Sequence, residues 1–180
     1  MMTYTTQYTS PVGKLILASD GKKLTGLWRA GQKYFAATLT EPPMARDRLP
    51  VLIAARKWLD RYFAGRPPAI ADLPLSPAGG EFRQAVWRLL CQIPYGQVVT
   101  YGDLAKQIAV RQHRPAMSAQ AIGGAVGHNP ISIIIPCHRV IGANGNLTGY
   151  AAGLPAKIQL LTHEGVNMTR LFTPAKSTAP

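Results

Sequence analysis

The sequence places one of its two cysteines, Cys137, directly before His138 and Arg139, in the segment IIIPCHRVIG. A thiol with the ordinary pKa of about 8.5 is only a few per cent thiolate at neutral pH, so a nucleophilic cysteine needs a base or a nearby positive charge. The candidate activators are His138, Arg139, His128 and His163, all in the same third of the chain, and Glu164 could orient or charge a histidine. These residue types predict nucleophilic chemistry at Cys137.

Cys137 and His138 are neighbours in the chain, which argues against a direct hydrogen bond between their side chains. Successive side chains of an extended chain point to opposite faces. We expect the three isoleucines to form a buried strand that stops at Pro136, and a turn or a bridging water to connect thiol and base. The alternative, a buried cysteine at a strand end beside a surface histidine, stays open on these residues alone.

The remaining cysteine and histidines give no second reactive centre. The two cysteines and four histidines contain no CxxC or HxxxH spacing, so we predict no metal site. Cys91 lies within a segment of helical periodicity and is expected to be a buried apolar residue. A cysteine hydrolase stays open as an alternative, because the cleft that it would need cannot be read from one sequence.

Three short helices are predicted upstream of the reactive segment. In EFRQAVWRLLCQIPYG, apolar residues recur at intervals of three and four until Pro94 and Gly96 end the helix. Thr100 and Asp103 match a capping box for the next helix, and Ser118 can cap the third, AQAIGGAVG, after the basic turn RQHRPAM. Two short helices joined by a turn indicate a helix-turn-helix.

The helix after Ser118 consists almost entirely of alanine and glycine and carries no charge. Each interior glycine costs about 0.5 to 1 kcal/mol relative to alanine, so some compensation is expected. One explanation is close packing against a neighbouring element. The other is a helix slim enough to enter a nucleic-acid groove. The residues alone do not decide between the two.

The first part of the chain predicts an α/β domain without catalytic residues. Two apolar, strand-like runs flank an Asp20-Gly21 turn, and a helix of roughly residues 49–63 ends at Gly65. Trp28, Trp58 and Tyr34 are expected in packing roles. The run GRPPAIADLPLSPAGG is typical of a connector. We therefore predict an N-terminal domain at 1–75, a second domain at 76–170 and a disordered tail at 171–180.

Composition points to a polyanionic partner. Lysine and arginine total 20 against 8 aspartate and glutamate, a net charge of +12, which favours nucleic acid. Two cysteines in 180 residues make no disulfide framework, and the start MMTYTTQYTS lacks the apolar run of a signal peptide. No segment approaches the roughly 18 to 20 apolar residues of a membrane span. We expect a soluble, cytoplasmic protein with reduced thiols.

The segments NPISIIIPCHRVIG and NGNLTGYAAGLPAKIQLLTHEG, with FRQAVWRLLCQIPYGQVVTYGDLA upstream, resemble the O6-alkylguanine-DNA alkyltransferases, also called methylated-DNA-protein-cysteine methyltransferases. The resemblance runs from about residue 80 to 165 and is loose before residue 75. It implies an α/β N-terminal domain similar to ribonuclease H and a mainly α C-terminal domain of winged helix-turn-helix type, which carries the chemistry.

The resemblance also implies roles for individual residues. Cys137 is then the alkyl acceptor, His138 the base that acts through a water, Glu164 the carboxylate that holds His138, Asn129 a brace for the loop, and Tyr101 a donor to guanine N3. The loop 148–153 with Tyr150 resembles a flap over the base. The residues implied to contact substrate or DNA are Ser118, Ala119, Gln120, Gly123, Arg139, Val140, Tyr150 and Ala151.

The implied activity is a single, irreversible transfer of an alkyl group from O6 of guanine, and from O4 of thymine, to Cys137 after the nucleotide is flipped out. It requires double-stranded DNA and no cofactor, and it implies a monomer. Two residues depart from the pattern: Gln120 stands where many members have arginine, and Ala152 where glycine is common. The alternative is a protein that recognises alkylated bases without repairing them, although such proteins replace the acceptor cysteine.

Overall fold

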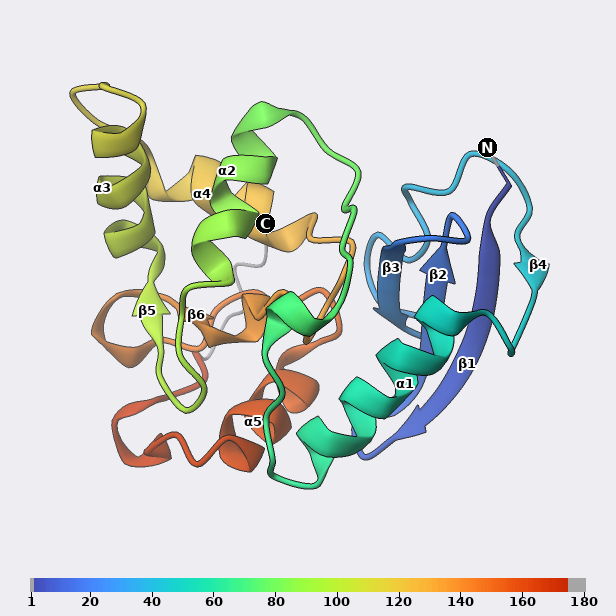
Figure 1. Cartoon of the computed structure of the whole chain (residues 1–180). Coiled ribbons are helices and arrows are strands. Elements are labelled where there is room, and N and C mark those ends of the chain that lie inside the picture. Colours follow the sequence, from blue (N-terminus) through green and yellow to red (C-terminus); the bar gives the residue numbers. More distant parts are fainter. Residues whose placement is uncertain (1, 175–180) are drawn as a thin grey trace. The chain divides into compact units, whose positions relative to one another are not determined.

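The computed structural model describes residues 2–174, which form two compact units (Figure 1). Among the described residues, the first unit comprises 2–78 together with Pro130–Ile134, and the second comprises Gly79–Asn129 and 135–174. The sequence predicted a simple division after residue 75. The structure differs because a short segment from the middle of the second range is hydrogen-bonded into the first unit.

The first unit is a four-stranded sheet covered by one helix. Strands β1 (Tyr4–Ser10), β2 (Gly13–Ser19) and β3 (Leu24–Arg29) are antiparallel, and β4 (Met44–Ala45) pairs with β1 in parallel, in the order β3-β2-β1-β4. The predicted turn joins β2 to β3, with Asp20 Oδ1 accepting from the backbone of Lys22 and Lys23. Gly21 there has a φ of +101°, which glycine adopts readily. The expected hairpin is confirmed.

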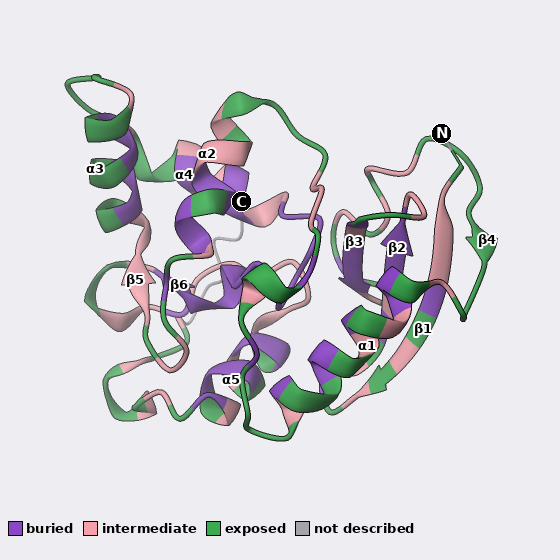
Figure 2. Cartoon of the chain, in the orientation of Figure 1, coloured by how far each residue is buried: buried purple, intermediate pink, exposed green. Residues whose placement is uncertain are grey.

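Helix α1 (Pro50–Phe63) supplies the other half of this unit's core. Its residues Leu52, Leu59 and Tyr62 are completely buried, as are Leu17 and Leu27 of the sheet. Figure 2 shows the buried residues on one side of α1 and exposed residues on the other. Trp28 and Trp58 are buried, consistent with the packing roles expected of them. The 3₁₀ turn η1 (Ile70–Asp72) follows in the connector.

The edge of this sheet holds the chain shortly before Cys137. The Leu27 backbone N–H donates to Pro130 O at 2.8 Å, and the Ser132 N–H donates to Leu27 O at 2.9 Å. Ile131 thereby forms a parallel bridge with Leu27 in β3. Strand β3 therefore fixes the backbone a few residues upstream of the reactive cysteine.

The three isoleucines do not form the strand that the sequence predicted. After the single bridge at Ile131 the chain turns, the Ile134 N–H donates to Ser132 O, and Ile133 has a φ of +70°. This left-handed backbone is unfavourable for a β-branched residue, by about 1 to 3 kcal/mol. Ile133, Ile134 and Ile135 are nevertheless buried, and their burial offsets the strain. The hydrophobic run reflects burial rather than an extended conformation.

The second unit is mainly helical. Its helices are α2 (Glu81–Leu90), α3 (Tyr101–Arg111), α4 (Ala119–Gly127) and α5 (Leu154–His163). Two short parallel strands, β5 (Val99–Thr100) and β6 (Val140–Ile141), and the 3₁₀ turns η2 (Cys137–Arg139), η3 (Ala143–Gly145) and η4 (Met168–Arg170) complete it. Both predicted caps are present: Thr100 and Asp103 form a reciprocal box, and Ser118 accepts from Ala121 N.

Helices α2, α3 and α4 pack against one another, with α3 and α4 joined by the basic turn. The Trp87 indole N–H in α2 donates to Ala125 O of α4 at 2.9 Å in the interior, which fixes these two helices together. Cys91 follows the last residue of α2 and is half-buried, rather than fully buried within the helix as predicted. The pattern of helix, turn and helix that the sequence indicated is present.

Part of the segment predicted as a disordered tail makes regular contacts. The Leu147 N–H donates to Phe172 O at 2.8 Å, and the Phe172 N–H donates to Gly145 O at 3.0 Å. Leu171 packs against a small core of Ile141, Leu147 and Leu161. Residues 175–180 of the predicted tail lie outside the described residues. Within residues 2–174, no helix is both long and apolar enough to cross a membrane.

Candidate active site

Cys137 begins the 3₁₀ turn η2, directly after Pro136. The turn that was expected after Pro136 is thus confirmed, and it leaves only 5% of Cys137 exposed. In a helix with three residues per turn, consecutive side chains diverge by about 120°. The Cys137 and His138 side chains therefore leave the backbone in different directions.

His138 is held by Glu164. The His138 Nε2 and Glu164 Oε1 atoms are 2.6 Å apart, and neither side chain is exposed. Burial lowers the pKa of His138; the hydrogen bond to Glu164 opposes this shift, and the charges of Arg139 and Lys157 add to it. The imidazole is therefore neutral at pH 7, and its Nε2 carries the proton donated to Glu164.

The other imidazole nitrogen is left as a proton acceptor. Nδ1 of His138 is buried and has no hydrogen-bond partner among the described residues. With Nε2 protonated, Nδ1 bears a lone pair. A buried acceptor without a partner costs free energy, which is commonly tolerated at functional sites. This nitrogen can take the proton of a nearby thiol.

Arg139 is placed differently from what the sequence suggested. Its Nε and Nη2 atoms donate to the two oxygens of Glu164 at 2.8 and 3.0 Å, and its Nη1 donates to Ile93 O at 2.6 Å. Only 6% of Arg139 is exposed. The prediction that Arg139 contacts DNA is wrong for this conformation, because the guanidinium is occupied inside the unit. It acts as the counter-charge that keeps Glu164 ionised.

Glu164 collects four hydrogen bonds, the fourth from Gly96 N to Oε2 at 3.2 Å. Burial raises the pKa of Glu164, but the hydrogen bonds and charges of His138 and Arg139 outweigh it and hold the pKa well below the usual range. The turn that contributes Gly96 also places the Tyr95 ring 5.7 Å from the Arg139 guanidinium. Sequence reasoning identified this turn only as a helix end.

Two tyrosines have hydroxyl groups whose pKa the charge of Cys137 raises. Tyr101 is the first residue of α3, and Tyr150 lies in the loop before α5, where its side chain hydrogen-bonds that of Cys137. Burial raises the pKa of both hydroxyls, and the charge of Cys137 raises them further. Both therefore stay protonated at neutral pH and can donate hydrogen bonds. Of the two, Tyr150 is hydrogen-bonded to the Cys137 side chain, and the role of Tyr101 stays a prediction.

Asn129 braces the backbone before Cys137. Its side-chain Nδ2 donates to Ile135 O at 2.8 Å in the interior, and the Cys137 N–H donates to the same carbonyl, also at 2.8 Å. Asn129 thus lies where the sequence placed it, between α4 and the reactive turn. Among the described residues, no group of three or more histidine, cysteine, aspartate or glutamate residues could hold a metal ion.

Lys157 is a site residue that sequence reasoning missed. This fully buried lysine of α5 donates from Nζ to Val140 O at 2.6 Å, Thr148 O at 2.9 Å and Gly149 O at 3.3 Å. It therefore ties the loop before α5 to the strand after Cys137. Burial lowers its pKa to about 8, partly opposed by Cys137. The signal in the sequence was a lysine on the apolar face of a helix, beside Ala156 and Leu160.

Comparison with known proteins agrees with this site. Family models match residues 3–77 as the ribonuclease-like domain and 81–166 as the DNA binding domain of 6-O-methylguanine DNA methyltransferase. The chain is 43% identical to a methylated-DNA–protein-cysteine methyltransferase of Haemophilus influenzae, covering 91% of this chain and 87% of that one. This chain belongs to the 6-O-methylguanine DNA methyltransferase family.

Other members of the methyltransferase family are similar over most of their length. A Methanosarcina acetivorans methylated-DNA–protein-cysteine methyltransferase is 42% identical, over 88% of this chain and 96% of its own. The crystal structure of the Mycobacterium tuberculosis O6-methylguanine methyltransferase has a TM-score of 0.73 at 40% identity, with 97% of each chain covered. The structure of the Mycobacterium tuberculosis protein in complex with DNA has a TM-score of 0.74, covering 90% of this chain and 93% of that one.

In this methyltransferase the residues predicted to face DNA or substrate lie on α4 and on the loop before α5. Ser118, Ala119 and Gln120 are exposed at the start of α4, and Gly123 is half-buried one turn later. Ala151 is half-buried in the loop. The Val140 carbonyl, predicted to contact the base, accepts a hydrogen bond from Lys157. Their contacts with DNA stay a prediction.

The glycines of α4 are not required by packing within the protein. A Cβ atom at Gly124 or Gly127 would have no described atom within 4 Å, and one at Gly123 would meet only the Tyr101 ring, at 3.9 Å. Of the two explanations for a helix of small residues, close internal packing therefore lacks support at these positions. The small residues therefore leave the surface of the helix thin at these positions.

We predict that Glu164→Gln slows alkyl transfer to Cys137 by roughly 100-fold or more, because the neutral amide no longer stabilises a protonated His138. Affinity for duplex DNA should not change. The measurement is the single-turnover rate at saturating duplex, below the unfolding temperature of the variant. Glu41→Gln, the same change at an exposed position away from the site, serves as the control. Weaker DNA binding with an unchanged rate would contradict the role assigned to Glu164.

Lys157 should make stability depend on pH. Below about pH 8 it is protonated in both the folded and unfolded chain, whereas between about 8 and the ordinary lysine pKa of about 10.4 only the unfolded chain binds the proton. Over this interval the free energy of unfolding of the wild type should rise by up to about 3 kcal/mol relative to Lys157→Met. Urea denaturation at several pH values measures it, with exposed Lys106→Met as the control.

Proposed function

We propose that this chain repairs DNA by transferring a methyl or other alkyl group from O6 of guanine to the sulfur of Cys137. The observation that carries this proposal is the buried thiol, bonded by Tyr150 and followed by a neutral His138 whose Nδ1 has no partner among the described residues. Membership of the methyltransferase family, whose relatives are named methylated-DNA–protein-cysteine methyltransferases, supports it.

The transfer begins with the thiol proton of Cys137, which passes through a water to Nδ1 of His138. Glu164 stabilises the resulting imidazolium through the short bond to Nε2. The thiolate attacks the alkyl carbon on O6; the S–C bond forms as the C–O bond breaks, and its electron pair stays on guanine. Tyr101 donates a proton to N3 of the leaving guanine and recovers one from His138.

The product is a thioether, and no step of this mechanism breaks its S–C bond. The cysteine is consumed, so each molecule acts once. The alkyl group comes from the DNA itself and the proton acceptor is a side chain of the chain, so the reaction requires no cofactor. The same attack on the alkyl carbon of O4-alkylthymine is chemically equivalent and belongs to the proposal.

The damaged base must leave the duplex to reach Cys137, since a buried thiol cannot enter the stacked helix. Flipping costs a few kcal/mol, and less for a weakened pair. We assign the receiving pocket to Tyr101, Tyr150 and the loop 148–153, with the backbone of Val140 and Ala151 facing the polar edge of the base. The bonds from Lys157 to Val140 and Thr148 hold this loop close to the reactive turn.

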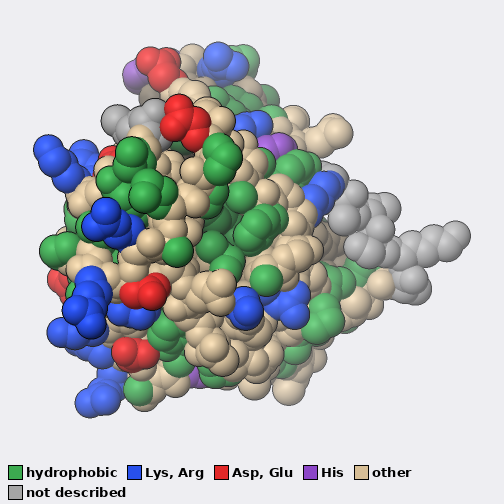
Figure 3. All heavy atoms as spheres, turned by 90° about the vertical axis from the view of Figure 1, so that its right-hand side faces the viewer, with side chains coloured by type: hydrophobic (Ala, Val, Ile, Leu, Met, Phe, Trp, Pro, Cys, Tyr) green, Lys and Arg blue, Asp and Glu red, His purple; other side chains and the backbone are tan. Residues whose placement is uncertain are grey.

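We assign DNA binding to a winged helix-turn-helix of the second unit, formed by α3 and α4. The thin, uncharged α4 suits the minor groove, where Ser118, Ala119, Gln120 and Gly123 would lie. The net charge of +12 favours a polyanion. Figure 3 shows Lys and Arg side chains spread over the face turned to the viewer, which is not the surface of α3 and α4. One similar structure is a complex with DNA.

We further propose that the protein acts as a monomer in the cytoplasm. Each chain carries its own complete set of Cys137, His138, Glu164 and Tyr101, so one copy suffices for one transfer. A nucleophilic thiol works only while reduced, and the cytoplasm keeps thiols reduced. Both cysteines of the structure are free.

Intact-mass measurement tests the function directly. After incubation with a duplex that contains one O6-methylguanine, the protein should gain one methyl group, located on the peptide that contains Cys137. The ratio of methyl groups to protein should not exceed one in excess substrate. Cys137→Ser should bind the duplex and gain nothing. Binding by the wild type without a mass gain would show the alternative function, recognition of alkylated bases without repair.

Gln120 gives a second prediction. Gln120→Arg adds a positive charge at an exposed position of α4 that we place against DNA. Duplex affinity should rise and the slope of log K against log salt should steepen by about 0.9 for one additional phosphate contact. Fluorescence anisotropy at several salt concentrations measures both. If the slope and the repair rate stay as in the wild type, Gln120 does not face DNA.

A further inference from the structure

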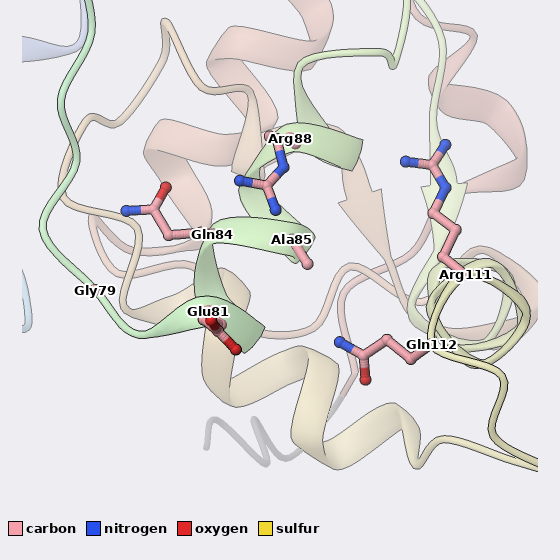
Figure 4. Close-up of a pocket in the computed structure, with 7 residues that line it drawn as sticks. All are labelled: Gly79, Glu81, Gln84, Ala85, Arg88, Arg111 and Gln112. Atoms are coloured by element: carbon pink, nitrogen blue, oxygen red, sulfur yellow. The ribbon is translucent and has the colours of Figure 1, made fainter.

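A groove lies between α2 and the end of α3, and its lining contains none of the residues assigned to the reaction. It has a volume of about 580 Å³ (Figure 4). Glu81, Gln84, Ala85 and Arg88 of α2 line one side, and Arg111 with Gln112 line the other. The four α2 residues follow a spacing of three, four and seven, which places them on one face of the helix. No role in the chemistry uses this groove.

Arg88 is exposed and has no hydrogen-bond or ion-pair partner among the residues that the structure describes. Across the groove, the Arg111 Nη2 donates to Gln92 Oε1 at 3.0 Å, which leaves its other N–H groups available. Figure 4 shows the Arg88 guanidinium and the Gln112 amide extending toward the space between the helices. The groove thus brings two guanidinium groups and an amide to one hollow.

These donors match a particular ligand chemistry. Planar guanidinium groups bind phosphate with two parallel N–H bonds, and two of them on facing helices favour a group with several acceptor oxygens. Glu81 is the only acidic residue of the lining, and it lies seven residues before Arg88, about 10 Å along the helix axis. An anion near Arg88 and Arg111 is therefore separated from the carboxylate.

We infer that this groove binds a phosphodiester of the DNA backbone beside the damaged site, with Arg88 and Arg111 as its ligands. The inference rests on the proposed function. Helices α2 and α3 both pack against α4, and the bond from Trp87 to Ala125 fixes α2 to it. Because α4 has no charged residue, the attraction for phosphate must come from elements next to it. The groove is formed by those two elements.

The first experiment compares Arg88→Gln with Arg83→Gln, which removes the same charge from an exposed position of α2 outside the groove. With a short unmodified duplex, Arg88→Gln should weaken binding about five- to tenfold and reduce the salt slope by about 0.9 between roughly 50 and 200 mM salt. Arg83→Gln should change binding by less than about twofold. Equal losses in both variants would overturn the inference, because net charge alone would explain them.

The second experiment locates the phosphate. Single neutral methylphosphonates are scanned along each strand, and binding is measured for the wild type and for Arg88→Gln. At one position the loss of binding caused by the methylphosphonate and the loss caused by Arg88→Gln should not add, because in the variant that phosphate has already lost its arginine partner. Arg111→Gln should identify the same position. Additive losses at every position would show that neither arginine contacts a phosphate.

Alkyl transfer from free O6-benzylguanine, which carries no phosphate, separates this inference from the proposed function. Arg88→Gln should react with the free base at the wild-type rate, because the groove lies apart from Cys137 and His138. If Cys137 of the wild type becomes alkylated but Arg88→Gln and Arg83→Gln bind DNA equally well, only the phosphate site is refuted. If the wild type gains no alkyl group from the O6-methylguanine duplex or from free O6-benzylguanine, the proposed function is refuted instead.

Discussion

The buried carboxylate of Glu164 is the constraint on which the rest of the site depends. An ionised carboxylate without solvent is costly unless it is fully paired, and here His138, Arg139 and Gly96 together satisfy both oxygens. Because Arg139 already balances the charge, the imidazole can remain neutral and available as a base. Three elements therefore meet at the Glu164 carboxylate: the turn at Tyr95, the 3₁₀ turn at Cys137 and the end of α5.

Around this centre the two units contribute differently. The second unit holds the reacting side chains, while the sheet of the first unit binds residues 130–134 through Leu27, immediately before the reactive turn. Asn129 and Ile135 on either side of that segment are joined to each other by a buried hydrogen bond. Hydrogen bonds thus hold the backbone that leads into the reactive turn.

Much of the fold could be predicted from the sequence, because its signals are local. The Asp20-Gly21 hairpin, the Thr100–Asp103 box and the Ser118 cap each depend on a few adjacent residues. The family resemblance implied that Cys137, His138 and Glu164 form one site. Their spacing in the sequence does not show that they lie close together. The inward guanidinium of Arg139, the three carbonyl bonds of Lys157 and the left-handed Ile133 depend on distant partners. An apolar run indicates burial and does not distinguish a strand from a buried turn.

The small residues of α4 also bear on which genomic sites such a protein can serve. Alanine and glycine offer no side-chain hydrogen bonds to base edges, and within Ala119–Gly127 only Gln120 could read one. Placed against DNA as we propose, α4 would read few base edges, so direct readout would add little discrimination between sequence contexts. Damage by alkylating agents can arise at guanines throughout a chromosome, so indifference to context is the property that surveillance of the whole genome requires.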